Sequence, residues 1–149
     1  MVKTRSSPVI SKILVMLRSL QTSESLPSFA RMNFDIKTEQ LSGDAYVISL
    51  TGEVDLYTAP EFKQQLLEVI GQGGKEVVVD FSGTTFIDST TLGVLVGGVK
   101  RLRTNDGQLS LVCNDRNITK IFEITGLDKV FTIYPTREEA VSAVGVPQG

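Results

Sequence analysis

The chain has 149 residues, 41% hydrophobic and 21% charged, which is enough for one folded domain and too few for two independent cores. A single cysteine excludes an intramolecular disulfide, and the absence of histidine excludes the usual zinc and haem ligand sets. The formal net charge of −2 divides into +4 on residues 1–31 and −6 on residues 32–149, which argues against nucleic acid as a direct partner of the folded part.

The first 31 residues are polar and serine-rich around one amphipathic stretch, in which Ile10, Ile13, Leu14 and Leu17 recur at helical spacing. We expect residues 1–31 to be an N-terminal extension, either poorly ordered or a short amphipathic helix, and residues 32–149 to be the domain. Such a helix suits a partner or a membrane surface. No run reaches the roughly 20 apolar residues that a membrane span needs.

The first clear strand signal is residues 46–50, continued by a turn-bearing stretch at 51–55. A helix is predicted next, because Thr58 and Glu61 have the spacing of a capping box and Pro60 is tolerated in a first turn. Its apolar stripe, and the glycines that end it, are Phe62, Leu66, Val69, Ile70, Gly71, Gly73 and Gly74.

Residues 76–81 contain three consecutive valines with no polar alternation, which is typical of a strand buried on both faces and central in its sheet. Residues 89–103 then predict a helix ended by Asn105, Asp106 and Gly107. Its apolar positions are Leu92, Leu95, Val96, Val99 and Leu102.

The pattern repeats with a strand at 108–113, a short helix at 117–124 closed by Gly126, and a strand at 130–134. A last helix begins at Thr136, which forms a second capping box with Glu139. Strands that alternate with helices predict an α/β domain with a largely parallel sheet.

The stretch FIDSTTLG, residues 86–93, places one acid and three hydroxyls at a helix start. A serine nucleophile needs a general base, and the chain has no histidine, while Lys100 lies three helical turns beyond Ser89. We therefore predict no catalytic residue and no enzyme activity. Asp80 and Asp88 are the nearest candidates for a metal pair, and we interpret them instead as solvated loop carboxylates.

At this helix start Asp88 or Ser89 is an N-cap candidate, and capping alone accounts for one of the four polar side chains. The helix dipole and unpaired backbone N–H groups also tolerate added negative charge there. A phosphate on Ser89 adds about −1.5 to −2 charge beside Asp88 and changes the surface strongly. Both roles, cap and phosphorylation site, remain open at this point.

Three segments, TGEVDLYTAPEF (51–62), VVVDFSGTTFIDSTTLGVLVG (77–97) and IFEITGLDKVF (121–131), resemble in order and spacing the STAS domains of bacterial anti-sigma factor antagonists. The resemblance covers about residues 34–144. It implies a single α/β STAS domain, with a mixed, mostly parallel central sheet of four to five strands flanked by about four helices.

The resemblance also implies a cytoplasmic partner-switching protein of transcription and stress regulation. Its unphosphorylated form would bind an anti-sigma factor serine kinase and free the sigma factor. Phosphorylation of Ser89 would end that interaction, and a serine phosphatase would restore it. No cofactor and no metal are expected, since the nucleotide belongs to the kinase.

The implied partner-binding residues are Asp55, Asp88, Ser89, Thr90, Thr91 and Gly93. The family usually has glycine where this chain has Thr91, so Thr91 is expected to narrow the kinase's approach, and Thr90 and Thr91 to compete as phosphate acceptors. Three alternatives stay open: a constitutive STAS scaffold in a membrane or lipid-transport assembly, a lipid-binding module using residues 10–20, and a small hydrolase.

Overall fold

The computed structural model describes residues 34–144, so the expectations for residues 1–31 lie outside the described part of the chain. The elements follow in the order β1 (Phe34–Ser42), β2 (Ala45–Val54), α3 (Ala59–Gly71), β3 (Glu76–Ile87), α4 (Ser89–Arg103), β4 (Gln108–Val112), α5 (Arg116–Thr125), a 3-10 helix (Leu127–Lys129), β5 (Thr132–Tyr134) and α6 (Arg137–Ala143).

The five strands form one sheet in the order β1-β2-β3-β4-β5. β1 pairs antiparallel with β2, and the remaining neighbours pair parallel. The predicted α/β class with a mixed, mostly parallel sheet is therefore confirmed. The parallel pairs require crossover connections, which α3, α4 and the α5 segment supply.

β3 lies at the centre of the sheet and is buried on both faces, as its valine run predicts. Val77 and Val79 belong to the larger core cluster, whereas Val78 belongs to a smaller cluster with Ala140 and Val141 of α6. The alternation of side chains along a strand therefore sends successive valines into two separate apolar layers.

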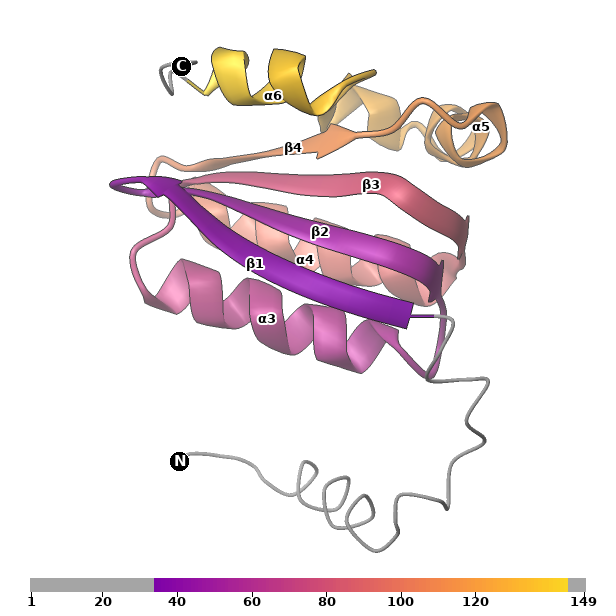
Figure 1. Ribbon diagram of the computed structural model, residues 1–149, viewed down its shortest axis with the longest axis horizontal. Helices are drawn as coiled ribbons and strands as arrows, with labels where there is room; N and C mark the ends of the chain where they lie inside the picture. The colour runs from indigo at the N-terminus through magenta and orange to yellow at the C-terminus, as the bar shows by residue number, and fades with distance from the viewer. Residues whose placement is uncertain (1–33, 145–149) are drawn as a thin grey trace, which may run out of the picture. The chain divides into compact units, whose positions relative to one another are not determined.

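α3 and α4 lie side by side on one face of the sheet, and α6 lies on the other (Figure 1). Among the residues of the larger cluster, α3 supplies Phe62 and Leu66, and α4 supplies Leu95 and Leu102. Each of the four is at most 1% exposed. α5 completes this cluster with Phe122, whose ring centroid lies 6.4 Å from that of Phe81.

Two local expectations differ from the structure. β1 was not predicted as a strand because it is mostly exposed, so its sequence FDIKTEQLS lacks a long apolar pattern. The strand expected at 130–134 begins only at Thr132, because residues 127–129 form the 3-10 helix. Half of the second capping box forms, since Thr136 Oγ1 accepts a hydrogen bond from the Glu139 N–H at 3.2 Å, while the Glu139 carboxylate accepts from the Thr136 hydroxyl at 3.5 Å.

Within residues 34–144 no helix combines the length and the apolarity required to cross a bilayer.

Two neighbouring glycines of α4 test the packing of α3 against α4. A Cβ on Gly97 meets nothing within 4 Å, whereas a Cβ on Gly98 lies 2.6 Å from Leu66 Cδ2 in the core. Gly97→Ala should raise the free energy of unfolding by about 0.5–1 kcal/mol through helix propensity. Gly98→Ala should lower it by about 1 kcal/mol, because overpacking a core outweighs that gain.

Urea denaturation of the two variants beside the unmodified protein measures both changes. Equal effects of Gly97→Ala and Gly98→Ala would contradict the close packing of Leu66 against α4.

Candidate functional site

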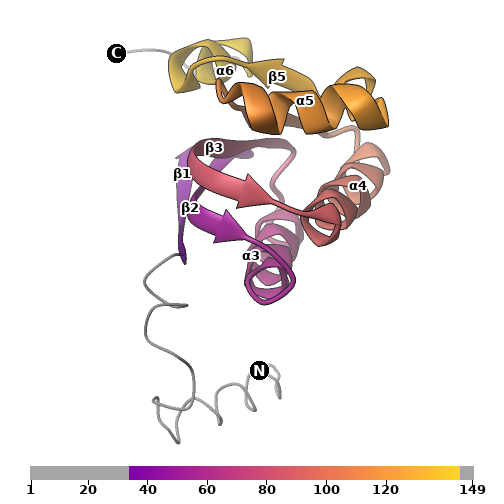
Figure 2. The same ribbon diagram turned by 90° about the vertical axis from the view of Figure 1, so that its right-hand side faces the viewer.

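The candidate site lies at the edge of the sheet where β2 and β3 end together. The two strands are parallel, and their last residues, Val54 and Ile87, are direct partners in the register. Each strand is followed at once by an acid, Asp55 or Asp88, and then by a helix. Figure 2 faces this edge and shows the ends of β2 and β3 beside the starts of α3 and α4. The sheet register therefore brings together two segments 33 residues apart.

Asp88 is the N-cap of α4. Its Oδ1 accepts hydrogen bonds from the Thr90 N–H at 3.0 Å and the Thr91 N–H at 3.3 Å. This answers the choice that the sequence left open, because the acid performs the capping and Ser89 does not. Two of the backbone N–H groups that a helix start leaves unpaired are therefore already satisfied by a carboxylate.

Ser89 is the first residue of α4 and is exposed. Its hydroxyl has no hydrogen-bond partner among residues 34–144, so no described hydrogen bond holds its side chain. Gly93 lies one helical turn further on, is also exposed, and has open space where a side chain would project. Ser89 and Gly93 therefore leave this stripe of α4 free of bulky side chains.

Thr91 departs from the expectation that it lies on the docking surface. Its side chain is 0% exposed, and its hydroxyl donates a hydrogen bond to the Val54 carbonyl at 2.7 Å. The third residue of the helix points into the molecule, so Thr91 neither narrows the approach to Ser89 nor offers an accessible hydroxyl. Thr90 is half-buried, so Ser89 is the one exposed residue of the three.

Asp55 begins a tight turn that connects β2 to α3. Its Oδ1 accepts hydrogen bonds from the Tyr57 N–H at 2.9 Å and the Thr58 N–H at 3.2 Å. The predicted capping box at Thr58 and Glu61 is wrong, because Thr58 makes no side-chain cap and its hydroxyl instead donates to the Glu53 carbonyl at 2.9 Å. One carboxylate oxygen of Asp55 therefore has a structural role in the turn.

Sequence reasoning missed three exposed apolar side chains at this edge. Leu56 and Tyr57 occupy the turn held by Asp55 and are 61% and 85% exposed. Phe86, the residue before the end of β3, is 48% exposed and pairs in the register with Glu53 of β2. The sequence did offer a signal for Leu56 and Tyr57, because large apolar residues in a tight turn are not placed there to fill the core and therefore indicate a contact surface. We call Leu56, Tyr57 and Phe86 the apolar rim of the site.

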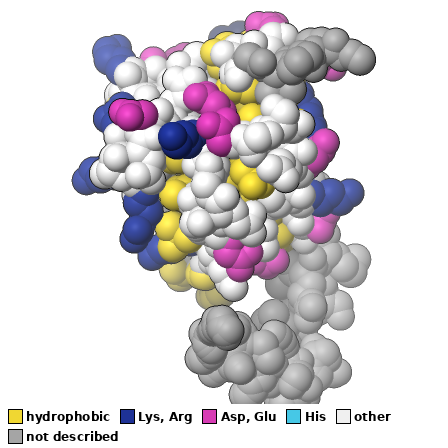
Figure 3. All heavy atoms as spheres, turned by 90° about the vertical axis from the view of Figure 1, so that its left-hand side faces the viewer, with side chains coloured by type: hydrophobic (Ala, Val, Ile, Leu, Met, Phe, Trp, Pro, Cys, Tyr) yellow, Lys and Arg dark blue, Asp and Glu magenta, His cyan; other side chains and the backbone are white. Residues whose placement is uncertain are grey.

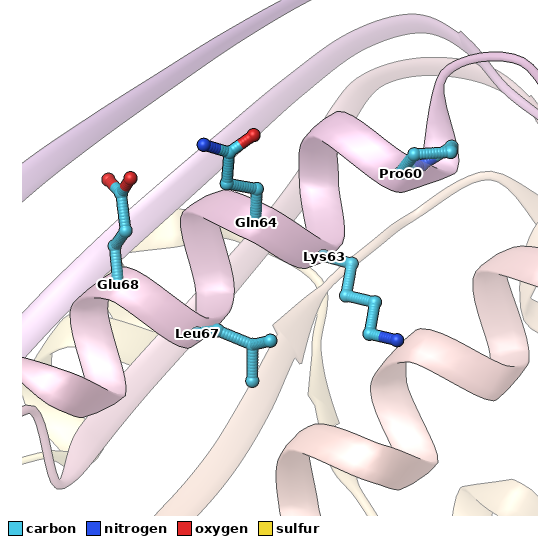
Figure 4. A pocket seen from close by; sticks show the side chains of 5 residues that line it. All are labelled: Pro60, Lys63, Gln64, Leu67 and Glu68. Carbon is cyan, nitrogen blue, oxygen red and sulfur yellow. The ribbon is translucent and has the colours of Figure 1, made fainter. Parts of the chain in front are cut away.

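Neither pocket found in the described structure contains Ser89. One is a shallow groove along the outer side of α3, lined by Pro60, Lys63, Gln64, Leu67 and Glu68 (Figure 4). The other lies around the buried Cys113, between α5 and β5. The exposed position of Ser89 suits contact with another protein better than enclosure of a small molecule.

The described residues offer no metal site at this edge. Residues 34–144 contain no group of three or more Cys, Asp or Glu side chains placed to hold an ion. Asp80 also differs from its interpretation as a solvated loop residue. It is 8% exposed within β3, and its Oδ1 accepts hydrogen bonds from the Ser82 N–H at 2.8 Å and the Ser82 hydroxyl at 2.6 Å.

The opposite edge of the molecule carries a different charge pattern. α4 ends there with Lys100, Arg101 and Arg103 in its last turn. In Figure 3, which faces that edge, Lys and Arg side chains gather along one side. Cations at a helix C-terminus complement its dipole. Lys100 is 11 residues from Ser89, about 16 Å along the helix, so the cations of α4 are too distant to pair with charge at its start.

The sequence and the structure of this chain are similar to those of known proteins. A profile of the family described as STAS domain matches residues 35–140. The anti-sigma-B factor antagonist of Staphylococcus epidermidis is 36% identical over 96 residues, which span 64% of this chain and 88% of that protein.

Two solved structures extend the comparison. An anti-sigma factor antagonist from Mycobacterium paratuberculosis has a TM-score of 0.68 and 30% identity, covering 74% of this chain and 93% of that one. The phosphorylated form of the Bacillus cell fate determinant SpoIIAA has a TM-score of 0.62 and 25% identity, covering 74% and 99%.

The capping role of Asp88 can be separated from its charge. Asp88→Ala should lower the free energy of unfolding by about 1 kcal/mol, because the Thr90 and Thr91 N–H groups lose their acceptor. Asp88→Asn should retain most of that stability, because its side-chain oxygen can still accept both hydrogen bonds. Urea denaturation measures the free energy of unfolding of both variants. An equal decrease in Asp88→Ala and Asp88→Asn would show that the charge of Asp88, and not its capping hydrogen bonds, stabilises α4.

Proposed function

Because the chain belongs to the STAS domain family, we propose that it is an anti-sigma factor antagonist whose unphosphorylated form binds an anti-sigma factor serine kinase. That binding releases the sigma factor held by the kinase. Phosphorylation of Ser89 ends the interaction, and a serine phosphatase restores it. The relatives named as anti-sigma factor antagonists support the general role, and the phosphorylated form of SpoIIAA supports control by phosphate.

The main support for the proposal is the accessibility of the Ser89 hydroxyl. Its hydroxyl is exposed, without a partner in residues 34–144, and directly beside the Asp88 cap. In the transfer, Ser89 Oγ forms a bond to the γ-phosphorus of the kinase's ATP, ADP leaves, and the hydroxyl proton passes to the kinase. We propose that the kinase supplies the base, because this chain has no histidine and the Asp88 carboxylate already caps the helix.

The surroundings of Ser89 suit a protein partner. The apolar rim offers area to bury, and the small residues Ser89 and Gly93 allow close approach to α4. We propose that Asp55, Asp88, Thr90 and Gly93 contribute to this docking surface together with the rim. Thr91 is excluded from direct contact by its burial.

The same geometry explains how phosphate acts as a switch. A phosphate on Ser89 would find the Thr90 and Thr91 N–H groups already bound to Asp88. Its charge of about −1.5 to −2 therefore stays largely uncompensated and close to another carboxylate. Burying such a charge in an interface is unfavourable unless the partner pairs it. Phosphorylation should therefore weaken binding without unfolding α4.

The first test is the modification itself. Peptide mass spectrometry of the protein isolated from its own host, before and after stress, should find phosphate on Ser89 with an occupancy that changes with conditions. Thr91 should carry none, because its hydroxyl is buried. An unmodified Ser89 under every condition would remove the switch and favour the alternative of a constitutive STAS scaffold.

The second test mimics the charge. Ser89→Asp should weaken binding to the cognate anti-sigma factor kinase by at least about tenfold, the cost of one uncompensated charge at an interface. Ser142→Asp is the matched control, because Ser142 is an exposed helix residue on α6. Isothermal titration calorimetry with each anti-sigma factor kinase of the host measures both. Similar affinities for the two variants would show that charge at Ser89 is not the switch.

A further inference from the structure

The peptide unit that joins Val54 to Asp55 is held on both sides by threonine hydroxyls. Its carbonyl, on Val54, accepts a hydrogen bond from Thr91 Oγ1 at 2.7 Å. Its N–H, on Asp55, donates to Thr58 Oγ1 at 2.9 Å. Thr91 belongs to the first turn of α4, and Thr58 precedes α3. One peptide plane is thus bonded to the start of each helix that borders the site.

We propose that Thr91 and Thr58 are positioning residues that fix the Asp55 turn relative to the Ser89 turn, so that the docking surface is already formed before the partner arrives. The positioning role of the two threonines rests on the proposed function only for the statement that this surface binds an anti-sigma factor kinase. We call the two hydrogen bonds to the Val54–Asp55 peptide the threonine clamp.

Thr91 links two parts of the site. Its backbone N–H donates to the Asp88 carboxylate at 3.3 Å, and its hydroxyl donates to the Val54 carbonyl at the end of β2. The cap of α4 and the last carbonyl of β2 are therefore bonded to one residue. Since Val54 and Thr91 are both 0% exposed, water cannot readily replace this hydrogen bond if the hydroxyl is removed.

Thr58 closes the other side of the clamp. Its hydroxyl accepts from the Asp55 N–H while donating to the Glu53 carbonyl at 2.9 Å. The Asp55 carbonyl in turn accepts from the Ala59 N–H at 2.7 Å, at the first residue of α3. Movement of the Val54–Asp55 peptide would therefore disturb the turn that presents Leu56 and Tyr57.

The parallel ladder alone does not set this arrangement. The pairing of β2 with β3 ends at Val54 and Ile87, and beyond it the two chains separate into different turns. The hydroxyl of Thr91 is the described contact that crosses from one turn to the other. A surface ordered in advance spends less binding free energy on ordering itself.

The experiment compares three variants at neighbouring positions. Thr91→Val keeps the shape and removes the hydroxyl, Thr91→Ser keeps the hydroxyl, and Thr90→Val makes the same chemical change at a hydroxyl without a partner in residues 34–144. The readout is amide hydrogen exchange by NMR at Asp55 and Ala59, with the Ala140 amide of α6, which donates to the Thr136 carbonyl, as internal reference.

Thr91→Val should speed exchange at Asp55 and Ala59 by about tenfold, the loss expected for one buried hydrogen bond, and should leave Ala140 unchanged. Thr91→Ser and Thr90→Val should exchange like the unmodified protein. If Thr91→Val leaves Asp55 and Ala59 within about twofold of the unmodified rates, the clamp is overturned, because Thr91 then only fills space.

Thr58→Val decides the case if Thr91→Val does not fold, because Thr58 is only half-buried. It removes the other side of the clamp and should speed exchange at Asp55 and Ala59 in the same way. Unchanged exchange at both amides in Thr58→Val would overturn the proposal from this side.

Binding to the anti-sigma factor kinase provides an independent arm. Thr91→Val should lose about tenfold in affinity and Thr91→Ser should recover it. If Thr91→Val speeds exchange but binds with unchanged affinity, the clamp does not preform the docking surface. If the unmodified protein binds no anti-sigma factor, the proposed function fails, and the exchange data still decide whether the clamp exists.

Discussion

The site depends on one constraint, the parallel pairing of β2 with β3, which continues through two register shifts up to Val54 and Ile87. β3 is apolar toward both layers and must lie at the centre of the sheet, which fixes the strand beside it. Because both strands run in the same direction and end at the same level, the acids that follow them reach one edge together. Ser89, the acidic cap and the apolar rim reach the same edge for this reason, and the Thr91 hydroxyl then links the two turns.

The sequence was most informative where structure depends on local spacing. α4 begins and ends at the predicted residues, because a carboxylate caps its start and Gly107 follows its end, where a side chain would meet the Lys75 carbonyl at 2.7 Å. Gly126 closes α5 as expected with a left-handed φ of 77°. β1 escaped prediction because an edge strand that is mostly exposed needs no apolar periodicity.

Two errors at the site share a different cause, since each concerns a threonine hydroxyl whose partner is distant in sequence or is not the expected one. Thr58 has the spacing of an N-cap residue. Its hydroxyl instead donates to the Glu53 carbonyl and accepts from the Asp55 N–H, so it does not cap α3. Thr91 was expected at the surface, yet its partner is a carbonyl 37 residues earlier. Spacing identifies a polar helix start but cannot tell which hydroxyl turns outward. The tertiary hydrogen bond from Thr91 to the Val54 carbonyl turns Thr91 inward and leaves Ser89 at the surface.

For the proposed phosphate on Ser89, these contacts predict an effect on recognition and not on folding. A helix start with unpaired N–H groups would bind the phosphate and be stabilised by it, giving an ordered anion site. Here Asp88 already satisfies the Thr90 and Thr91 N–H groups, and the clamp holds the turns on both sides. We therefore expect the added charge neither to replace the cap nor to reorganise the edge. We expect it to remain on the surface beside Asp88 and to act on the binding of a protein that approaches the apolar rim.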